Sequence, residues 1–347
     1  MQRPAAHLMR LAEWEENRLE QAPVISERSP RPRHRIFSTS RLTLVLAISL
    51  SALLASLSYA LADSDTRAKT STTIGSSLNP SAFGQLVTYT ASVTSRAGIP
   101  SGTVTFKGGD STLGSATLNR GQATLSTPIL KVGVHSVTAV YQGDASFATS
   151  TSAPVLQTVN KETTLTRLNV SADSSTFGQA VNLTASVFSK ANSPTGNVVF
   201  KDGVKMLGAG ILTPFLQAKF STSSLDAGTH AISAVYMGDG SFATSQSTPV
   251  KHTVIQQTTS TQVASNNNPS KLKQITSFTA AVSPKEANGR IVFYDGATSI
   301  GTTVLKSGSA SIDVSSLAAG SHSITAKYMG SVNFRGSSSA PLNQVVR

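Results

Sequence analysis

The sequence predicts an all-β protein in which one β-sandwich domain is repeated three times. The first observation is a stretch, His135 to Phe147, that returns as His230 to Phe242 and again as His322 to Phe334. The copies lie 95 and 92 residues apart, which is the length of a domain rather than of a solenoid repeat. The second observation is composition: charged residues make up only 13% of the chain, and Ser, Thr, Gly, Ala and Val are abundant, which favours short strands and turns over helices.

The first copy, from residue 72 to residue 159, alternates apolar and polar residues in the manner of strands with one buried face. An opening strand is expected near residues 72–76, and Gly-rich turns such as 107–110 separate the strands that follow. The apolar residues that mark these strands are Val87, Tyr89, Ala91 and Val93; Val104 and Phe106; Leu113, Ala116 and Leu118; Ala123 and Leu125; Val137, Ala139 and Tyr141; and Leu156 and Val159. About seven short antiparallel strands in about ninety residues predict a β-sandwich.

The second copy, residues 163–254, and the third, residues 258–346, repeat this order of strands and turns. The linkers between copies are only a few residues long, for example 160–162 and 256–257. Short linkers limit bending, so we expect a semi-rigid, semi-extended rod rather than a cluster of domains. The chain has no cysteine, so each domain must be held by its own hydrophobic core without disulfides.

The N-terminal part differs in character from the repeats. Residues 1–41 are polar and Arg-rich and are expected to be poorly ordered. Residues 42–61 carry no charge, follow Arg41, and end in the small-x-small sequence Ala60-Leu61-Ala62 before Asp63. Residues 42–62 therefore predict either a signal peptide cleaved after Ala62, which we favour, or an uncleaved single-pass membrane anchor. Under both interpretations the chain after residue 63 lies outside the cytoplasm, and the true translation start stays open.

The net charge of +12 does not predict a nucleic-acid-binding protein. The basic residues are scattered among the repeats, with no clustered patch and no nucleic-acid-binding motif. Attraction to an anionic cell surface or to a polyanionic glycan is the more modest inference.

Three histidines and three tyrosines recur at equivalent positions, and we expect structural roles for both sets. His135, His230 and His322 each open a strand after a glycine turn. Because they lie a domain apart, they cannot share one metal ion, and local hydrogen bonding is the favoured role. Tyr141, Tyr236 and Tyr328 face inward on the same strands, so a packed ring with its hydroxyl bonded to backbone is expected.

Asp144 and Asp239 follow glycine in turns, where they could bind a cation or cap the turn. An interdomain Ca²⁺ site would have to combine several oxygen ligands, from among Asp144, Asp239, Asp202 and Glu162. Acidic residues are few, and Ser331 replaces Asp in the third copy, so turn capping is favoured. The sequence holds no nucleophile motif, phosphate-binding loop or zinc spacing. We therefore predict no catalytic residue, no metal site and no cofactor.

Three motifs taken together resemble the bacterial Ig-like repeat family of the group-three type. The middle copy fits best, with Gly196-Asn-Val-Val-Phe-Lys-Asp-Gly203, Leu225-Asp-Ala-Gly-Thr-His230 and Gly238-Asp-Gly-Ser-Phe242. The first copy departs at residues 130–133, and the third departs at Ser331. The resemblance covers residues 72–346. It implies Ig-like sandwiches without the antibody-type Cys-Trp-Cys core, in an architectural or adhesive role, and it carries no family-wide functional residue.

We therefore expect a non-catalytic, exported bacterial protein at the cell surface, in the periplasm or secreted. It would present Ig-like binding modules on a semi-rigid rod, with an extracellular protein or glycan as its unknown partner. The sequence leaves open whether the rod adheres or is a passive stalk. The alternative is an accessory fragment, for example a carbohydrate-associated one, of an extracellular enzyme whose catalytic domain is absent.

Overall fold

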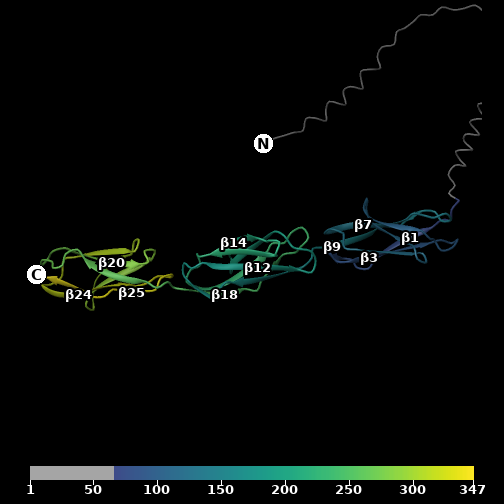
Figure 1. The fold of residues 1–347 in the computed structure, drawn as a ribbon. Helices are drawn as coiled ribbons and strands as arrows, with labels where there is room; N and C mark the ends of the chain where they lie inside the picture. The colour runs from purple at the N-terminus through teal and green to yellow at the C-terminus, as the bar shows by residue number, and fades with distance from the viewer. Residues whose placement is uncertain (1–65) are drawn as a thin grey trace, which may run out of the picture. The chain divides into compact units, whose positions relative to one another are not determined.

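The computed structural model describes residues 66–347, and all regular elements in this range are β-strands. They form three successive β-sandwiches, which we call the first, second and third repeats (Figure 1). The predicted all-β class and the three tandem domains are confirmed. The basic region 1–41 and the apolar segment 42–62 lie outside the described residues. Within the described part of the chain, no helix is long and apolar enough to cross a membrane.

Each repeat consists of a three-stranded sheet packed against a larger one. In the first repeat the three-stranded sheet contains β1 (Ser71–Ser76), β3 (Val87–Thr94) and β6 (Gln122–Thr127). The larger sheet contains β2 (Ser81–Ala82), β9 (Val155–Asn160), β7 (Gly133–Tyr141), β4 (Thr103–Gly108) and β5 (Ser111–Thr117) in that order, with β8 (Ser150–Thr151) paired to β7. Seven strands of five residues or more agree with the predicted number, and the two-residue β2 and β8 add to them.

The second repeat has the same topology. Its three-stranded sheet contains β10 (Thr164–Val170), β12 (Val181–Ser189) and β15 (Gln217–Thr222). The larger sheet contains β11 (Ser174–Thr176), β18 (Val250–Ile255), β16 (Gly228–Tyr236), β13 (Asn197–Asp202) and β14 (Lys205–Ile211), with β17 (Ser245–Gln246) paired to β16.

The third repeat again follows this plan. Its three-stranded sheet contains β19 (Ser260–Ser265), β20 (Thr276–Ser283) and β23 (Ser309–Val314). The larger sheet contains β22 (Thr298–Val304), β21 (Arg290–Asp295), β24 (Gly320–Tyr328), β25 (Ser337–Ser338) and β26 (Leu342–Val346).

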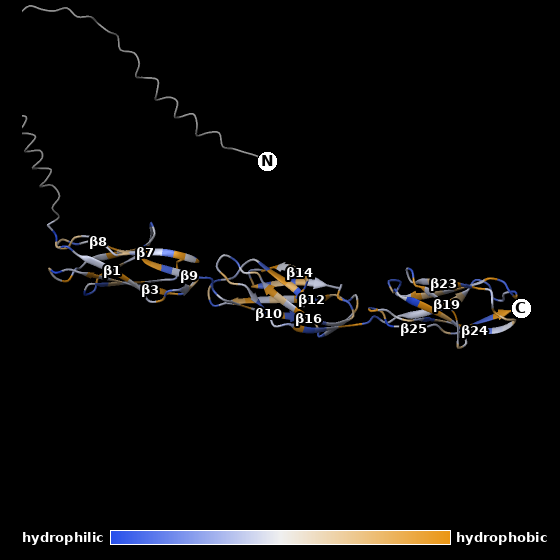
Figure 2. Cartoon of the chain, turned by 180° about the vertical axis from the view of Figure 1, so that it is seen from behind, coloured by the Kyte–Doolittle hydropathy of each residue, from blue (hydrophilic) through white to orange (hydrophobic). Residues whose placement is uncertain are grey.

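The core of each repeat lies between its two sheets and follows from the period-two alternation of the strands. In β7 the inward residues Val137, Ala139 and Tyr141 are fully buried, while Ser136 is exposed. Figure 2 shows polar and apolar residues interspersed along the strands of all three repeats. Each repeat has its own cluster of buried apolar side chains, as a chain without cysteine requires.

The last strand of each repeat buries a polar side chain, which differs from a simple apolar alternation. Leu156, one of the residues that mark β9, is exposed, and Gln157 is fully buried in its place. The Gln157 amide donates to the carbonyl of Leu78 at 2.9 Å, where the chain passes from β1 to β2. His252 and Gln344 occupy the same place in the other repeats and bond to Ala172 and Asn267. The buried polar group thus satisfies a backbone carbonyl that the change of sheet leaves unpaired.

The opening part of each repeat contributes to both sheets. After β1 pairs with β3, the chain crosses over and β2 runs parallel to β9, with Ser81 opposite Val159. In the second repeat β11 pairs in parallel with β18, and in the third Ser270 forms a parallel bridge with Val346.

Candidate functional site

The recurring histidines lie at strand entries and bond to nearby backbone, as expected. The Nε2 atoms of His135, His230 and His322 lie 2.7, 2.7 and 2.9 Å from the carbonyl oxygens of Lys131, Asp226 and Ala318, each four residues earlier. These bonds close the loop that precedes the strand.

Two of the three histidines also pair with a carboxylate. Nδ1 of His230 lies 2.7 Å from Oδ2 of Asp202, and Nδ1 of His322 lies 2.6 Å from Oδ2 of Asp295. Asp202 and Asp295 end β13 and β21, which pair with the histidine-bearing strands β16 and β24. In the first repeat Gly108 occupies the equivalent position, so that repeat has no such pair.

Hydrogen bonds to backbone carbonyls and to carboxylates raise the pKa of these two histidines. Burial works against the imidazolium of His230, but the hydrogen bonds to Asp202 and to the Asp226 carbonyl outweigh it, and the pKa of His230 is raised. The bond to the Ala318 carbonyl and the bond to Asp295 together raise the pKa of His322. Both pairs are partly exposed to solvent, so the stabilisation from each is modest.

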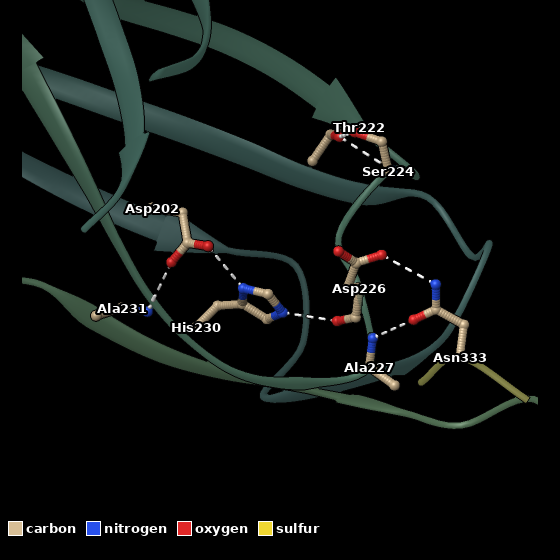
Figure 3. A network of polar contacts seen from close by, with 8 residues as sticks. All are labelled: Asp202, Thr222, Ser224, Asp226, Ala227, His230, Ala231 and Asn333. Atoms are coloured by element: carbon tan, nitrogen blue, oxygen red, sulfur yellow. Dashed lines mark hydrogen bonds and ion pairs between the residues drawn. The ribbon is translucent and has the colours of Figure 1, made fainter. Parts of the chain in front are cut away.

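The His230 network extends to the third repeat (Figure 3). Besides His230, Asp202 accepts a bond from the backbone N–H of Ala231 at 3.1 Å. The side-chain amide of Asn333 donates to the Asp226 carboxylate at 2.9 Å, and its carbonyl accepts from the N–H of Ala227 at 2.7 Å. Asn333 therefore satisfies one charged acceptor and one backbone donor in the loop before β16.

Aromatic pairs occur where one repeat follows another. Phe83, just after β2, makes an edge-to-face contact with Phe242, with ring centroids 5.8 Å apart. Phe177, just after β11, meets Phe334 in the same way at 5.4 Å. Edge-to-face geometry is the favourable arrangement for two aromatic quadrupoles.

Asp144 and Asp239 cap turns, as predicted. Oδ1 of Asp144 accepts from the N–H groups of Ser146 and Phe147, both at 2.8 Å, and Oδ2 accepts from the Ser101 hydroxyl at 2.6 Å. The Ser101 hydroxyl, followed by the backbone N–H groups, lowers the Asp144 pKa to about 2. Asp239 makes the equivalent bonds to Thr195, Ser241 and Phe242.

The carboxylates considered for calcium serve separate structural purposes. Asp202 bonds His230, whereas Asp144 and Asp239 each cap a turn in a different repeat. Glu162 forms a parallel bridge with Phe242 through its backbone. Among residues 66–347, no three His, Asp or Glu side chains lie close enough together to hold a metal ion.

The recurring tyrosines are fully buried, and two of them make the expected bond to backbone. The Tyr236 hydroxyl donates to the carbonyl of Thr195 at 2.7 Å, and the Tyr328 hydroxyl donates to the carbonyl of Asn288. Burial, followed by the nearby Asp239, raises the pKa of Tyr236 to about 12. The hydroxyl of Tyr141 makes no corresponding bond to backbone.

The outer face of the three-stranded sheet in the second repeat carries exposed apolar residues that no local sequence motif indicates. Leu165 on β10 lies opposite Phe188 on β12, and both side chains point away from the core, with 51% and 46% of their surface exposed. Phe215, in the loop before β15, is 87% exposed. These three residues stand out in the sequence only when the three copies are compared, because the first and third repeats have no apolar residue at the equivalent positions.

The fold, the repeated turn network and the cores define this protein as a tandem array of Ig-like modules. A family comparison gives the same result: the bacterial Ig-like domain (group 3) matches residues 72–160, 168–255 and 263–347. The chain belongs to this family. A search of the curated proteins finds no match.

Several solved structures match this chain at low sequence identity. FdeC, an Escherichia coli adhesin, is 14% identical, with 80% of this chain and 96% of that chain covered and a TM-score of 0.28. A Ca²⁺-stabilized adhesin of an Antarctic bacterium is 15% identical, with 80% and 74% covered and a TM-score of 0.31. The fibronectin(III)-like modules of Clostridium thermocellum CbhA are 20% identical, with 53% and 93% covered and a TM-score of 0.24. Likeness at this level carries no information about function.

Proposed function

We propose that this chain is an exported, non-catalytic protein that presents Ig-like modules outside the cytoplasm for structural support or adhesion. The observation that carries the proposal is the contrast between the inside and the outside of the repeats. Tyr141, Tyr236 and Tyr328 are equally buried in the three cores, whereas the residues at one equivalent turn position, Arg120, Phe215 and Ser307, differ in chemistry. A scaffold kept constant while its surface varies suits presentation of binding surfaces.

Two further features support the proposal. The side chains best suited to acid–base chemistry, His230 and His322, are already bonded on both ring nitrogens to loop and strand neighbours. The sequence of residues 42–62 suits a signal peptide or an anchor, which would put the repeats outside the cytoplasm.

Export is tested by protease treatment of intact cells and spheroplasts that produce the full chain. We expect the repeats to be degraded while a cytoplasmic control protein survives. Survival of the repeats until the inner membrane is lysed would contradict export. N-terminal sequencing of the exported chain separates a cleaved signal, which leaves Asp63 at the N-terminus, from a retained anchor.

Adhesion and passive support are separated by comparing surface variants with repeat deletions. If the protein adheres, substitutions on one outer face abolish attachment and leave the length of the array unchanged. If it is a passive stalk, only deletion of a whole repeat has an effect. Robust hydrolysis of a glycan or peptide by the purified chain would overturn the non-catalytic assignment.

A further inference from the structure

We propose that the outer face of the three-stranded sheet in the second repeat binds an anionic polysaccharide. The outer face consists of the outward side chains of β10, β12 and β15 together with Phe215 in the loop before β15. This inference rests on the proposed function, because the face must lie outside the cytoplasm to meet such a polymer. It concerns one surface of one repeat.

Three apolar side chains form a row across this face, which we call the apolar row: Leu165, Phe188 and Phe215. Leu165 and Phe188 are directly opposite in the register of β10 and β12. The N–H of Val187 donates to the carbonyl of Leu216 at 3.0 Å, which extends the pairing of β12 and β15 and places Phe215 level with Phe188. The backbone register therefore aligns the three positions from one edge of the sheet to the other.

The first and third repeats serve as internal comparisons, because the same backbone positions can be identified in them. The N–H groups of Val93 and Val282 donate to Gly121 and Gly308, as Val187 donates to Leu216. The row residues that follow from these pairings are Ser71, Thr94 and Arg120 in the first repeat, and Ser260, Ser283 and Ser307 in the third. The fold does not require apolar residues there, so their presence in the second repeat calls for another cause.

The turn that carries Phe215 also departs from the other repeats. Asn119 pairs with Gln122 across two residues, whereas Thr213 pairs with Gln217 across Pro214, Phe215 and Leu216. Leu216 has φ of 60°, in the left-handed region where glycine is favoured. Arg120 and Ser307 also have left-handed φ in the shorter turns, at 52° and 48°, so the second repeat differs in the extra length of its turn and in the exposed phenylalanine that the turn presents.

The charge of the outer face favours an anion. Arg167 on β10 and Lys219 on β15 point outward, and the three strands contain no Asp or Glu. The guanidinium carbon of Arg167 lies 5.7 Å from the centre of the Phe188 ring. The matching strands of the first repeat carry no charge, with Arg120 in the adjoining turn, and those of the third carry only Asp313.

The remaining outward groups suit a saccharide. Next to the row, Arg167, Ser186 and Gln217 lie side by side across the sheet, and Asn169, Thr184 and Lys219 follow in the next register. Thr184 and Lys219 also line a shallow hollow on this face. Hydroxyl and amide groups can bond sugar hydroxyls, aromatic rings can pack against the C–H face of a pyranose, and the two cations can pair with carboxylate or sulfate groups.

A polysaccharide fits this face better than a protein partner. A stable protein interface covers about 800 Å² on each side and has an apolar centre with a polar rim. The apolar row here is only three side chains long and lies along one end of an otherwise polar, open sheet. An extended polymer can lie across such a strip and bind through repeated weak contacts.

The test measures binding of the full chain to polygalacturonate, a carboxylated polysaccharide, with dextran as the neutral control. The variant L165S/F188T introduces the residues that the first repeat has at the two equivalent positions, and F215S introduces the residue that the third repeat has. R167Q removes the positive charge next to Phe188. We expect L165S/F188T and R167Q each to weaken binding about tenfold or more, and F215S to weaken it several-fold. The controls are L156S, an exposed leucine of the first repeat, and K251Q, a cation on the other sheet of the second repeat; both should bind like the unaltered chain. Matching melting temperatures establish that the variants are folded.

Each other outcome overturns the proposal. These outcomes are no binding to polygalacturonate, equal binding to dextran, or salt-sensitive binding that the control K251Q weakens as much as R167Q does. Attachment to target cells that is lost after protease treatment but survives removal of surface glycans would instead identify a protein partner. A chain that binds polygalacturonate through this face yet is retained in the cytoplasm would refute the proposed function and leave the site intact. An exported chain that does not bind polygalacturonate would refute this site and leave the proposed function intact.

Discussion

The Nδ1 atom of His230 lies 2.7 Å from Oδ2 of Asp202, and this pair joins the start of β16 to the end of the neighbouring strand β13. Its counterpart, His322 with Asp295, holds the same place in the third repeat. The first repeat has a histidine but Gly108 in place of the carboxylate. One structural position therefore occurs with and without the ion pair inside a single chain.

The two His–Asp pairs predict a stability that decreases as pH rises. Because folding raises the pKa of His230 and His322, their contribution is present in full below the ordinary imidazole pKa and is lost as pH rises through the raised values. We expect the free energy of unfolding of the second and third repeats to fall by a few tenths of a kcal/mol each between about pH 6 and about pH 8. Urea unfolding at a series of pH values measures this, and D202N/D295N should flatten the dependence. An unchanged slope in the double variant would refute the assignment.

The amide of Asn333 predicts protection of one backbone N–H in the second repeat. In the N333S variant, which carries the residue found at the equivalent positions 146 and 241, the acceptor for the Ala227 N–H is lost. We expect hydrogen exchange at Ala227 to accelerate about tenfold, since the bond is replaced by contact with solvent. Exchange at Ala231, which bonds to Asp202, is the internal control. Equal protection at Ala227 in both proteins would show that the bond has no effect in solution.

Removal of a tyrosine hydroxyl should affect the repeats unequally. Y236F leaves the Thr195 carbonyl without its donor and should lower the free energy of unfolding by about 1 kcal/mol. Y141F removes a hydroxyl that makes no corresponding backbone bond, so it should be close to neutral. Chemical denaturation of the two variants provides the comparison. Equal losses would show that ring packing, rather than the hydroxyl bond, is responsible.

Gly208, in the middle of β14, lies so close to the opposite sheet that we expect no larger residue to fit there without a cost in stability. A Cβ atom at Gly208 would overlap the ring of Phe220, which stacks on Phe200 in the core. We expect G208A to cost about 1–3 kcal/mol through overpacking. The control is G240A, because that position has open space around it and Ala145 stands at its equivalent in the first repeat. Thermal unfolding measures both, and a neutral G208A would mean that Phe220 can move aside.

The repeated motif was sufficient to predict the fold, because inward residues of β7, β16 and β24 recur with strict alternation. The turn-capping role of Asp144 and Asp239 also followed from their position after glycine. The pairing of His230 with Asp202 did not, since the residues are 28 apart in sequence and meet only through the register of β13 and β16. The buried Gln157 does not follow from apolar alternation, which marks this strand by Leu156 and Val159, although its spacing of two from Val159 indicates the inward face.

The apolar row can be identified only from the strand register together with the comparison between the three repeats. Leu165, Phe188 and Phe215 lie in three separate sequence segments, so no local pattern connects them. Exposure of single apolar residues is common and by itself indicates little. Only their alignment on one face, and the polar residues at the same places in the other repeats, distinguish them from ordinary surface residues.

The parallel pairing of the short second strand with the last strand has a mechanical consequence. In the second repeat β11 enters beside β18, the strand by which the chain leaves, and Ser174 to Thr176 lie opposite Thr253 to Ile255. A pull on the two ends of such a domain drives these neighbouring strands in opposite directions along their length. The hydrogen bonds between these strands are then loaded together in shear and do not break one after another. The other repeats hold shorter versions of this contact, two residue pairs between β2 and β9 and one bridge between Ser270 and Val346, so the second repeat should resist such a pull best.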